Sequence, residues 1–368
     1  MSVTGVRNSV FSAAAYVAGK TIEEVQREYG LKDVIKLGSN ENPYGPFPAA
    51  MREMQAELNR LNEYPDASFL ELRGKLGELM ELTADHIAIG HGAGGILETI
   101  AGAFLEPGDE AIVPTQSYGL YREISKVAGA KIVEVPLTGD YRLNIAAMRA
   151  AMSERTKIVW LCNPNNPTGT VADPDDIHQL AEQLPSQAWL VIDEAYAEFA
   201  KVDVLPDVAS LVERHRVIGV RTFSKAYALA GGRIGYCIAH PDVIGVVDTV
   251  SEPFNANRVG IAGALASITE DLPVARSAIQ ALVESRAALE SLLADSGFAV
   301  KPTETNFIFF DTGRSADELA QALLERGVIV RSASAWGYPQ HLRVTVGTNE
   351  QNDRFLEAFR EVTGLQHG

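Results

Sequence analysis

The sequence has few cysteines and no long apolar run. Cys162 and Cys237 are the only two cysteines in 368 residues, which excludes a disulfide framework and a cysteine-rich zinc module. We expect both to be buried thiols in a reducing compartment. No stretch approaches the roughly 18 uninterrupted apolar residues of a membrane span. We also expect Met1 to begin the mature chain without a signal peptide. Together these features predict a cytoplasmic protein.

The chain also lacks an excess of basic residues. It has 32 Lys and Arg against 48 Asp and Glu, a net charge of −16 at pH 7. A chain this acidic has no overall basic surface for nucleic acid or for an anionic membrane. Its seven histidines show no metal-ligand spacing, so we expect no metal. Apolar residues make up 46% of the chain, which is enough to form a packed core.

Short apolar runs alternate with helical periodicity from about residue 84 to residue 240. This pattern predicts an α/β fold: a large domain whose mostly parallel, seven-stranded sheet lies between helices. From about residue 297, strands flank a helix at 315–325, which predicts a second, smaller α+β domain. We expect an N-terminal segment at 1–40 packing on the small domain, a large domain at 41–280 and the small domain at 281–368. The expected strands of the large sheet are 86–90, 110–114, 131–135, 157–162, 189–193, 217–220 and 234–238.

Unusual polar segments follow the ends of several expected strands. They are Gly90–Gly95, Asn163–Gly169, Asp193–Tyr196 and Thr222–Lys225. Each has an ordinary explanation when taken alone: Asn-Pro-Thr-Gly is a turn, the glycine-rich turn lacks the spacing of a dinucleotide fingerprint, and a single lysine is usually solvated. Open α/β sheets, however, bind ligands beyond the carboxyl ends of their strands. The combination therefore predicts one ligand site.

These segments carry a family resemblance. Ser224–Arg233 resembles the pyridoxal-phosphate lysine motif of fold-type I aminotransferases, and Asn166–Gly169 and Asp193–Tyr196 resemble two further signatures of that superfamily. A closer resemblance, to histidinol-phosphate aminotransferases, covers most of the chain from about 16 to 348. It is carried by Ser39–Pro46, Tyr64–Asp66, Cys162–Gly169, Asp193–Phe199, Thr222–Gly235 and Leu342–Thr348.

The resemblance implies pyridoxal 5'-phosphate as cofactor and assigns residues to its ring. Lys225 would bond the cofactor covalently and move the substrate proton as general base and acid, which requires a depressed pKa. Asp193 would pair with the ring nitrogen. Asn166 and Tyr196 would hydrogen-bond the phenolic oxygen, and Tyr118 would stack on the ring. We expect the Asn166–Pro167 bond to be cis, in keeping with the family.

The resemblance places the cofactor phosphate at the N-terminus of a helix, where anions are favoured. The turn there departs from the family, which more often has Ser-Asp-Glu or similar residues, because its side chains offer no donor. The phosphate should therefore depend more on other side chains, one of them from the neighbouring subunit of a homodimer. The groups implied are the N–H groups of Ala93, Gly94 and Gly95, the side chains of Thr222, Ser224 and Arg233, and Tyr64 across the interface.

Substrate residues are implied by the same resemblance. Arg343 and Arg331 match the two arginines that hold a substrate carboxylate or phosphate, as charge-assisted forks can. Tyr16 matches an aromatic residue near the substrate. The implied reaction converts histidinol phosphate and 2-oxoglutarate into imidazole-acetol phosphate and glutamate, in L-histidine biosynthesis. Alternatives are an aromatic (Phe/Tyr) aminotransferase, a phosphothreonine decarboxylase, and a non-enzymatic cofactor-binding domain, which would need a lost lysine or a fused nucleic-acid module.

Overall fold

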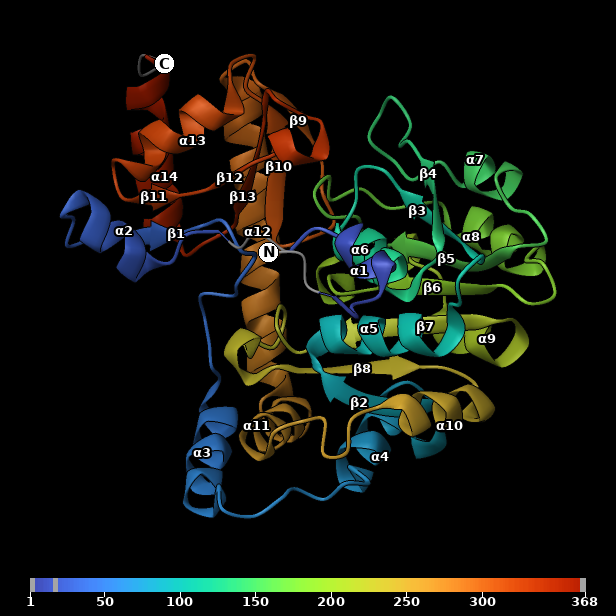
Figure 1. Cartoon of the computed structure of the whole chain (residues 1–368). Helices are drawn as coiled ribbons and strands as arrows, with labels where there is room; N and C mark the ends of the chain where they lie inside the picture. The colour runs from blue at the N-terminus through green and yellow to red at the C-terminus, as the bar shows by residue number, and fades with distance from the viewer. Residues whose placement is uncertain (1–3, 16–18, 365–368) are drawn as a thin grey trace.

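The computed structural model describes residues 4–15 and 19–364 (Figure 1). Its large sheet has seven strands in the order β2-β8-β7-β6-β5-β3-β4. Strand β8 runs antiparallel to both β2 and β7, and every other pair is parallel. The predicted fold class and all seven predicted strands are confirmed. The strands are β2 (Ile87–His91), β3 (Glu110–Pro114), β4 (Lys131–Val135), β5 (Thr156–Cys162), β6 (Trp189–Asp193), β7 (Val217–Thr222) and β8 (Ile234–Ile238).

Helices cover both faces of this sheet because its central strands are apolar on both sides. Along β5, Trp160 packs into the core on one face and Leu161 into the core on the other, as the two-residue period of a strand requires. One face carries α5 (Gly92–Phe104), α6 (Leu120–Ala128) and α10 (Pro241–Val250). The other carries α4 (Leu70–Leu79), α7 (Ile145–Ala150), α8 (Pro174–Glu182), α9 (Val208–Arg214) and α11 (Arg258–Thr269).

A second, antiparallel sheet has the strand order β12-β13-β10-β9. The long helix α12 (Leu272–Asp295) runs up to it from the large sheet (Figure 1), and Leu289 of α12 and Phe310 of β10 belong to the same buried core. We propose that the two domains divide within α12. The small sheet and its helices are β9 (Ala299–Lys301), β10 (Phe307–Asp311), β12 (Arg331–Ser332), β13 (His341–Thr345), α13 (Ala316–Leu324) and α14 (Asn349–Thr363).

The N-terminal segment contacts both domains. Strand β1 (Ile35–Lys36) pairs with β11 (Val328–Ile329), and α2 (Ile22–Tyr29) packs on the same part of the small domain. The short helix α1 (Asn8–Phe11) instead lies against α6, where Ser9 Oγ donates to the Val127 carbonyl at 3.0 Å. Beyond β1, the chain crosses to α3 (Pro48–Glu57), which packs on α11.

Three further properties concern the described part of the chain. Cys162 and Cys237 are buried free thiols, as predicted. Within residues 4–15 and 19–364, no helix combines the length and apolarity that a membrane crossing requires. The same ranges contain no group of three His, Cys, Asp or Glu side chains that could hold a metal ion.

Candidate active site

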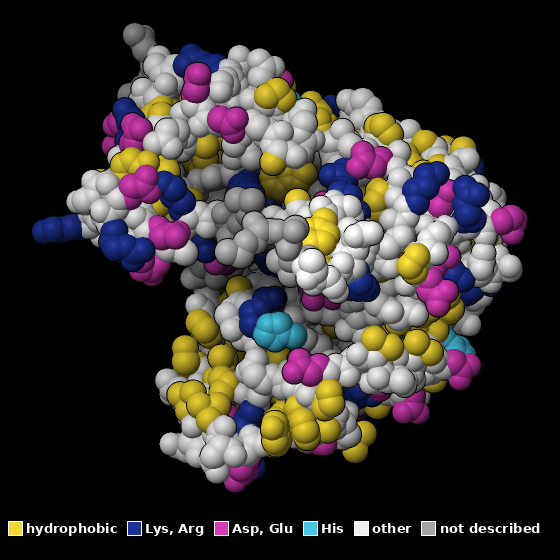
Figure 2. Space-filling model, in the orientation of Figure 1, with side chains coloured by type: hydrophobic (Ala, Val, Ile, Leu, Met, Phe, Trp, Pro, Cys, Tyr) yellow, Lys and Arg dark blue, Asp and Glu magenta, His cyan; other side chains and the backbone are white. Residues whose placement is uncertain are grey.

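A cavity of about 480 Å³ lies between the carboxyl edge of the large sheet and the small domain. Figure 2 shows the molecule hollowed between its upper and lower parts on this face, with basic side chains near the hollow. Most of the predicted site residues line this cavity, although they come from segments more than 200 residues apart. They are Ala93, Gly94, Tyr118, Asn166, Asp193, Tyr196, Thr222, Ser224, Lys225, Arg233, Arg331 and Arg343.

Lys225 follows β7 and presents its amine to the cavity. Its Nζ donates to the carbonyl of Ser39 at 3.0 Å. Burial of the amine, with the positive charges of Arg343 and Arg233 nearby, lowers the pKa of Lys225 from 10.5 to about 8. Loss of hydration and like charges both disfavour the ammonium form. A substantial fraction of this amine is therefore neutral near pH 8, as a nucleophile and proton carrier must be.

Asp193 ends β6 and is only 3% exposed. Its Oδ1 accepts from the Ala195 N–H at 3.1 Å, and its Oδ2 accepts from the Tyr121 hydroxyl at 2.7 Å. Burial raises the pKa of Asp193 from 3.8 to about 6, although these two hydrogen bonds oppose the rise. A cationic partner in the cavity would favour the ionised carboxylate, so the residue fits a protonated ring nitrogen.

Tyr121 was missed by the sequence reasoning. It is fully buried in α6 and stacks on Trp160, with ring centroids 5.4 Å apart and planes 10° apart. Its ring also meets Tyr118 edge-on at 5.5 Å. The available signal was spacing: Tyr118 and Tyr121 are three residues apart at the start of an expected helix, which puts them on neighbouring positions of one face.

Asn40 was also missed, although it lies in the segment that carries the resemblance. Its Nδ2 donates to the Tyr196 hydroxyl at 2.9 Å, and its backbone N–H donates to Thr345 Oγ1 at 2.9 Å. Burial raises the pKa of Tyr196, so this phenol stays protonated and can donate. Asn166 Oδ1 accepts from Arg343 Nη1 at 2.5 Å. The Asn166–Pro167 bond is cis, as predicted.

The glycine-rich turn and Arg233 meet at one end of the cavity. Helix α5 begins at Gly92, which has φ +69°, and a Cβ there would lie 2.6 Å from Arg233 Nη2. The positive φ favours glycine here, and its lack of a side chain leaves room for the Arg233 guanidinium. Arg233 Nη1 donates to Ser224 Oγ at 3.4 Å, and Thr222 Oγ1 donates to the same oxygen at 3.0 Å. A helix N-terminus, a guanidinium and a hydroxyl converge here, which suits a phosphate. Ala93 and Gly94 line the cavity there, whereas Gly95 does not.

The opposite wall belongs to the small domain. Arg331 of β12 lies directly across from Arg343 of β13, and Trp336 has its ring 5.8 Å from the Arg331 guanidinium and 5.4 Å from that of Arg343. The indole N–H of Trp336 donates to the Ser117 carbonyl at 3.0 Å, and both residues line the cavity. Arg343 Nη2 donates to the Gly38 carbonyl at 2.6 Å. Trp336 was not predicted, because a single tryptophan in a loop carries no signal of its own.

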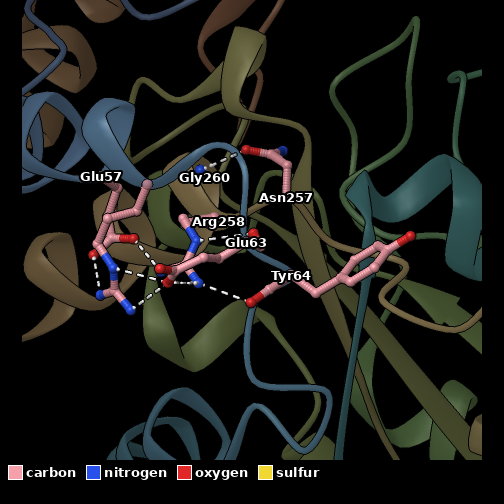
Figure 3. A network of polar contacts seen from close by, with 7 residues as sticks. Glu57, Glu63, Tyr64, Asn257, Arg258 and Gly260 are labelled. Atoms are coloured by element: carbon pink, nitrogen blue, oxygen red, sulfur yellow. Dashed lines mark hydrogen bonds and ion pairs between the residues drawn. The ribbon is translucent and has the colours of Figure 1, made fainter.

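Besides Gly95, the predicted residue Tyr64 does not line this cavity. Tyr64 is 76% exposed and stacks on Phe254, with ring centroids 4.4 Å apart. Figure 3 shows its ring pointing away from the polar network that surrounds Arg258. Within one chain Tyr64 therefore does not reach the site. Tyr16 lies outside the described residues.

The residues present fit pyridoxal phosphate. An anion cradle lies at one end, an amine lies beside it, a buried acid faces the same cavity, and Tyr118 supplies an aromatic wall. This fold with this donor set defines a pyridoxal-phosphate-dependent aminotransferase.

Comparison with known proteins agrees. The model of the family "aminotransferase class I and II" matches residues 32–359, and the chain belongs to that family. A histidinol-phosphate aminotransferase of Symbiobacterium thermophilum is 40% identical over 364 residues, covering 98% of this chain and 99% of the relative. One of Moorella thermoacetica is 40% identical over 363 residues, covering 98% and 94%.

Solved structures show the same fold. A histidinol-phosphate aminotransferase from Sinorhizobium meliloti, solved in complex with pyridoxal-5'-phosphate, superposes with a TM-score of 0.89 at 28% identity, covering 98% of this chain and 99% of that one. An aspartate aminotransferase from Thermotoga maritima superposes with a TM-score of 0.84 at 22% identity, covering 98% and 100%. The second likeness extends to the fold alone.

Proposed function

We propose that this chain is a histidinol-phosphate aminotransferase, which transfers an amino group between histidinol phosphate and 2-oxoglutarate. The observation that carries the proposal is the pair of arginines, Arg331 and Arg343, on the wall opposite the Lys225 amine. Two guanidinium groups suit a phosphate or a second carboxylate, so one site can accept both histidinol phosphate and glutamate. The names of the 40% identical relatives support the same substrate.

The proposed chemistry assigns each wall residue a task. Bound pyridoxal phosphate supplies the electron sink that stabilises a carbanion at the substrate Cα. Lys225, whose lowered pKa leaves a substantial fraction of the amine neutral near pH 8, would take the proton from the substrate Cα and pass it to the cofactor carbon that receives it during amino transfer. Asp193 holds a proton on the ring nitrogen, and Asn166 and Tyr196 hold the phenolic oxygen. Tyr118 packs on the ring face.

We propose the phosphate ligands as predicted. The N–H groups at the start of α5 and the Ser224 and Arg233 side chains bind the phosphate from one chain. Thr222 orients the Ser224 hydroxyl, to which it donates. The convergence of these groups on one end of the cavity supports this assignment.

We further propose that two copies of the chain form a homodimer and that Tyr64 completes the phosphate site of the partner. An exposed apolar surface supports this proposal: Leu58, Leu61 and Tyr64 are 53%, 63% and 76% exposed, and Phe254 lies beside Tyr64. Figure 2 shows hydrophobic side chains gathered over α3 and the lower part of the large domain. A second copy is the occupant that would both cover this surface and use Tyr64. Sedimentation of the wild-type protein and of Leu61→Asp tests it, since the substitution should yield monomers.

We also propose a cytoplasmic location. Two buried free thiols are compatible with a reducing compartment. Cell fractionation tests this proposal, and recovery in an extracytoplasmic fraction would contradict it.

A panel of amino donors with 2-oxoglutarate as acceptor tests the substrate. We expect kcat/KM to be highest for histidinol phosphate. A higher value for phenylalanine or tyrosine would instead identify an aromatic aminotransferase. Release of CO₂ from phosphothreonine without any acceptor would identify a decarboxylase.

A further inference from the structure

The segment Phe254–Arg258, which runs from the loop after α10 to the first residue of α11, contacts two segments at the phosphate end of the site and the exposed segment that carries Tyr64. We call it the 254–258 clamp. None of its five residues lines the cavity, and none was singled out by the sequence motifs. Its side chains nevertheless bond to the strand that precedes α5, to the residue before Arg233, and to the backbone of Tyr64.

The two asparagines of the clamp act within the chain. Asn255 Nδ2 donates to the Ile89 carbonyl at 3.0 Å, on the strand that leads into the glycine-rich turn. Asn257 Nδ2 donates to the Gly232 carbonyl at 2.7 Å, and its Oδ1 accepts from the Gly260 N–H at 2.7 Å, which caps α11. Arg233 itself has φ +56°, a conformation that is unfavourable for a residue with a side chain. Neighbouring contacts must therefore hold it, and the bond from Asn257 is one of them.

Arg258 acts on the exposed arm that carries Tyr64. Its side chain is only 12% exposed. Nη2 donates to the Tyr64 carbonyl at 2.8 Å, and Nε donates to the Glu63 carbonyl at 3.4 Å. Nη1 donates to the Glu57 carboxylate at 2.5 Å, which anchors the guanidinium to the end of α3. Figure 3 shows these contacts meeting at the Arg258 side chain, with one of them reaching the Tyr64 carbonyl, while the phenol of Tyr64 points away.

We propose that the 254–258 clamp positions the cofactor-phosphate ligands of two sites at once. Asn257 positions Arg233 in the site of its own chain, and Arg258 positions Tyr64 for the site of the partner chain. The proposal rests on the proposed function, and its second half rests on the proposed dimer. These are positioning residues, because they act through Arg233 and Tyr64 and do not line the cavity themselves. Outer-shell partners of this kind commonly control ligand affinity.

The affinity of the apoenzyme for pyridoxal phosphate tests both halves without using turnover. Asn257→Asp keeps the Oδ1 cap of α11 but removes the donor to Gly232. Arg258→Ala removes the bonds to Glu63 and Tyr64. We expect each to raise the dissociation constant about tenfold, while Arg60→Ala, an exposed neighbour that pairs with Glu57 and Glu63, stays within about twofold of wild type.

Folding and phosphate specificity are controlled in the same experiment. Thermal melting of each apoenzyme checks the fold, and if Arg258→Ala does not fold, Arg258→Lys replaces it, because lysine keeps the charge beside Glu57 without the fork. Inorganic phosphate should compete less well with the cofactor in Asn257→Asp than in wild type. An Asn257→Asp apoenzyme that binds cofactor and phosphate like wild type would overturn the first half.

Mixed dimers test the second half. In a mixed dimer, a chain with Lys225→Ala cannot bond the cofactor through a lysine. The visible absorbance band of the lysine-bonded cofactor therefore reports only the site that contains the other chain's Lys225. When Arg258→Ala and Lys225→Ala are in one chain paired with wild type, we expect the reporting site to be weakened about tenfold. When they are in opposite chains, we expect wild-type affinity. The reverse pattern would overturn the assignment to the partner's site.

Two results would separate failure of this inference from failure of the proposed function. Wild-type chains that bind cofactor as monomers would overturn the dimer and the Arg258 half, while Asn257→Asp would still decide the other half. Wild-type apoenzyme that binds no pyridoxal phosphate would overturn the proposed function and the whole clamp proposal with it.

Discussion

The two walls of the cavity are built in different ways. The large-domain wall is made by residues that end or follow strands of one sheet, such as Asp193 and Lys225, and neighbouring strands hold them. The small-domain wall is held by residues that are distant in sequence. Arg343 bonds to Gly38 and Asn166, which are 305 and 177 residues away along the chain. The difference teaches that one sheet places the residues of the cofactor half, to which Ser39 and Asn40 of the N-terminal segment only add contacts, with Lys225 and Tyr196. The substrate half exists only once two domains and the N-terminal segment have docked.

Removing the Lys225 amine should have the largest effect and should strike both substrates alike. We expect Lys225→Ala to lower the rate of each half-reaction on the order of 10⁴-fold, with histidinol phosphate and with glutamate, because the proton carrier is lost. Single-turnover absorbance measures both. Circular dichroism controls for folding, and a rate within tenfold of wild type would remove Lys225 from the mechanism.

A substitution on the small-domain wall should discriminate between substrates. We expect Arg331→Gln to lower kcat/KM for histidinol phosphate by about 100-fold, since a charge-assisted contact to the phosphate is lost. The value for phenylalanine should change by less than about threefold. Arg326→Gln, a surface arginine of the same domain paired with Glu361, serves as control. Equal losses for both donors would contradict the assignment.

Tyr121→Phe should shift the pH dependence of cofactor binding and leave the small-domain wall unchanged. The pKa of Asp193 is raised to about 6 by burial, and the Tyr121 hydroxyl opposes that rise. A protonated Asp193 cannot pair with a cationic ring, so cofactor affinity of the apoenzyme should fall as pH drops through about 6. Without the hydroxyl we expect this midpoint to move up by about one pH unit.

Fluorescence titration of the apoenzyme at several pH values measures the midpoint. Ser125→Ala is the matched control, because Ser125 bonds to Trp160 in the same buried cluster and makes no bond to Asp193. A midpoint that stays at the wild-type value in Tyr121→Phe would show that the phenol does not tune the acid.

The smallest effect should come from the contact that joins the two walls. Trp336→Phe keeps an aromatic ring beside the arginines but loses the N–H bond to Ser117. We expect KM for histidinol phosphate to rise about fivefold with kcat nearly unchanged. Trp189→Phe, at the end of β6 opposite to Asp193, should leave both constants as in wild type. A fall in kcat alone would contradict a role in joining the walls.

The large-domain wall was easier to predict from the sequence than the small-domain wall. The strands and the residues at their ends were predictable, because buried strands are apolar and ligand residues follow them. The direction of β8 was not, since a buried strand has the same composition whichever way it runs. Asn40 and Trp336 gained their places through contacts with Tyr196 and Ser117, which are distant in sequence and leave no local pattern. The contact of α1 with α6 was likewise not anticipated.

The reversed direction of β8 has one more consequence. Because Thr222 of β7 pairs with Gly235 of β8, the chain leaves and re-enters the sheet at the same point, and Lys225 and Arg233 lie in one closed loop. The length of this loop limits how far apart the Lys225 amine and the Arg233 guanidinium can lie. A molecule that engages both must carry an aldehyde and an anion at matching separation. In the proposed site, an unphosphorylated form of the cofactor would therefore bond to Lys225 but offer no anion to Arg233.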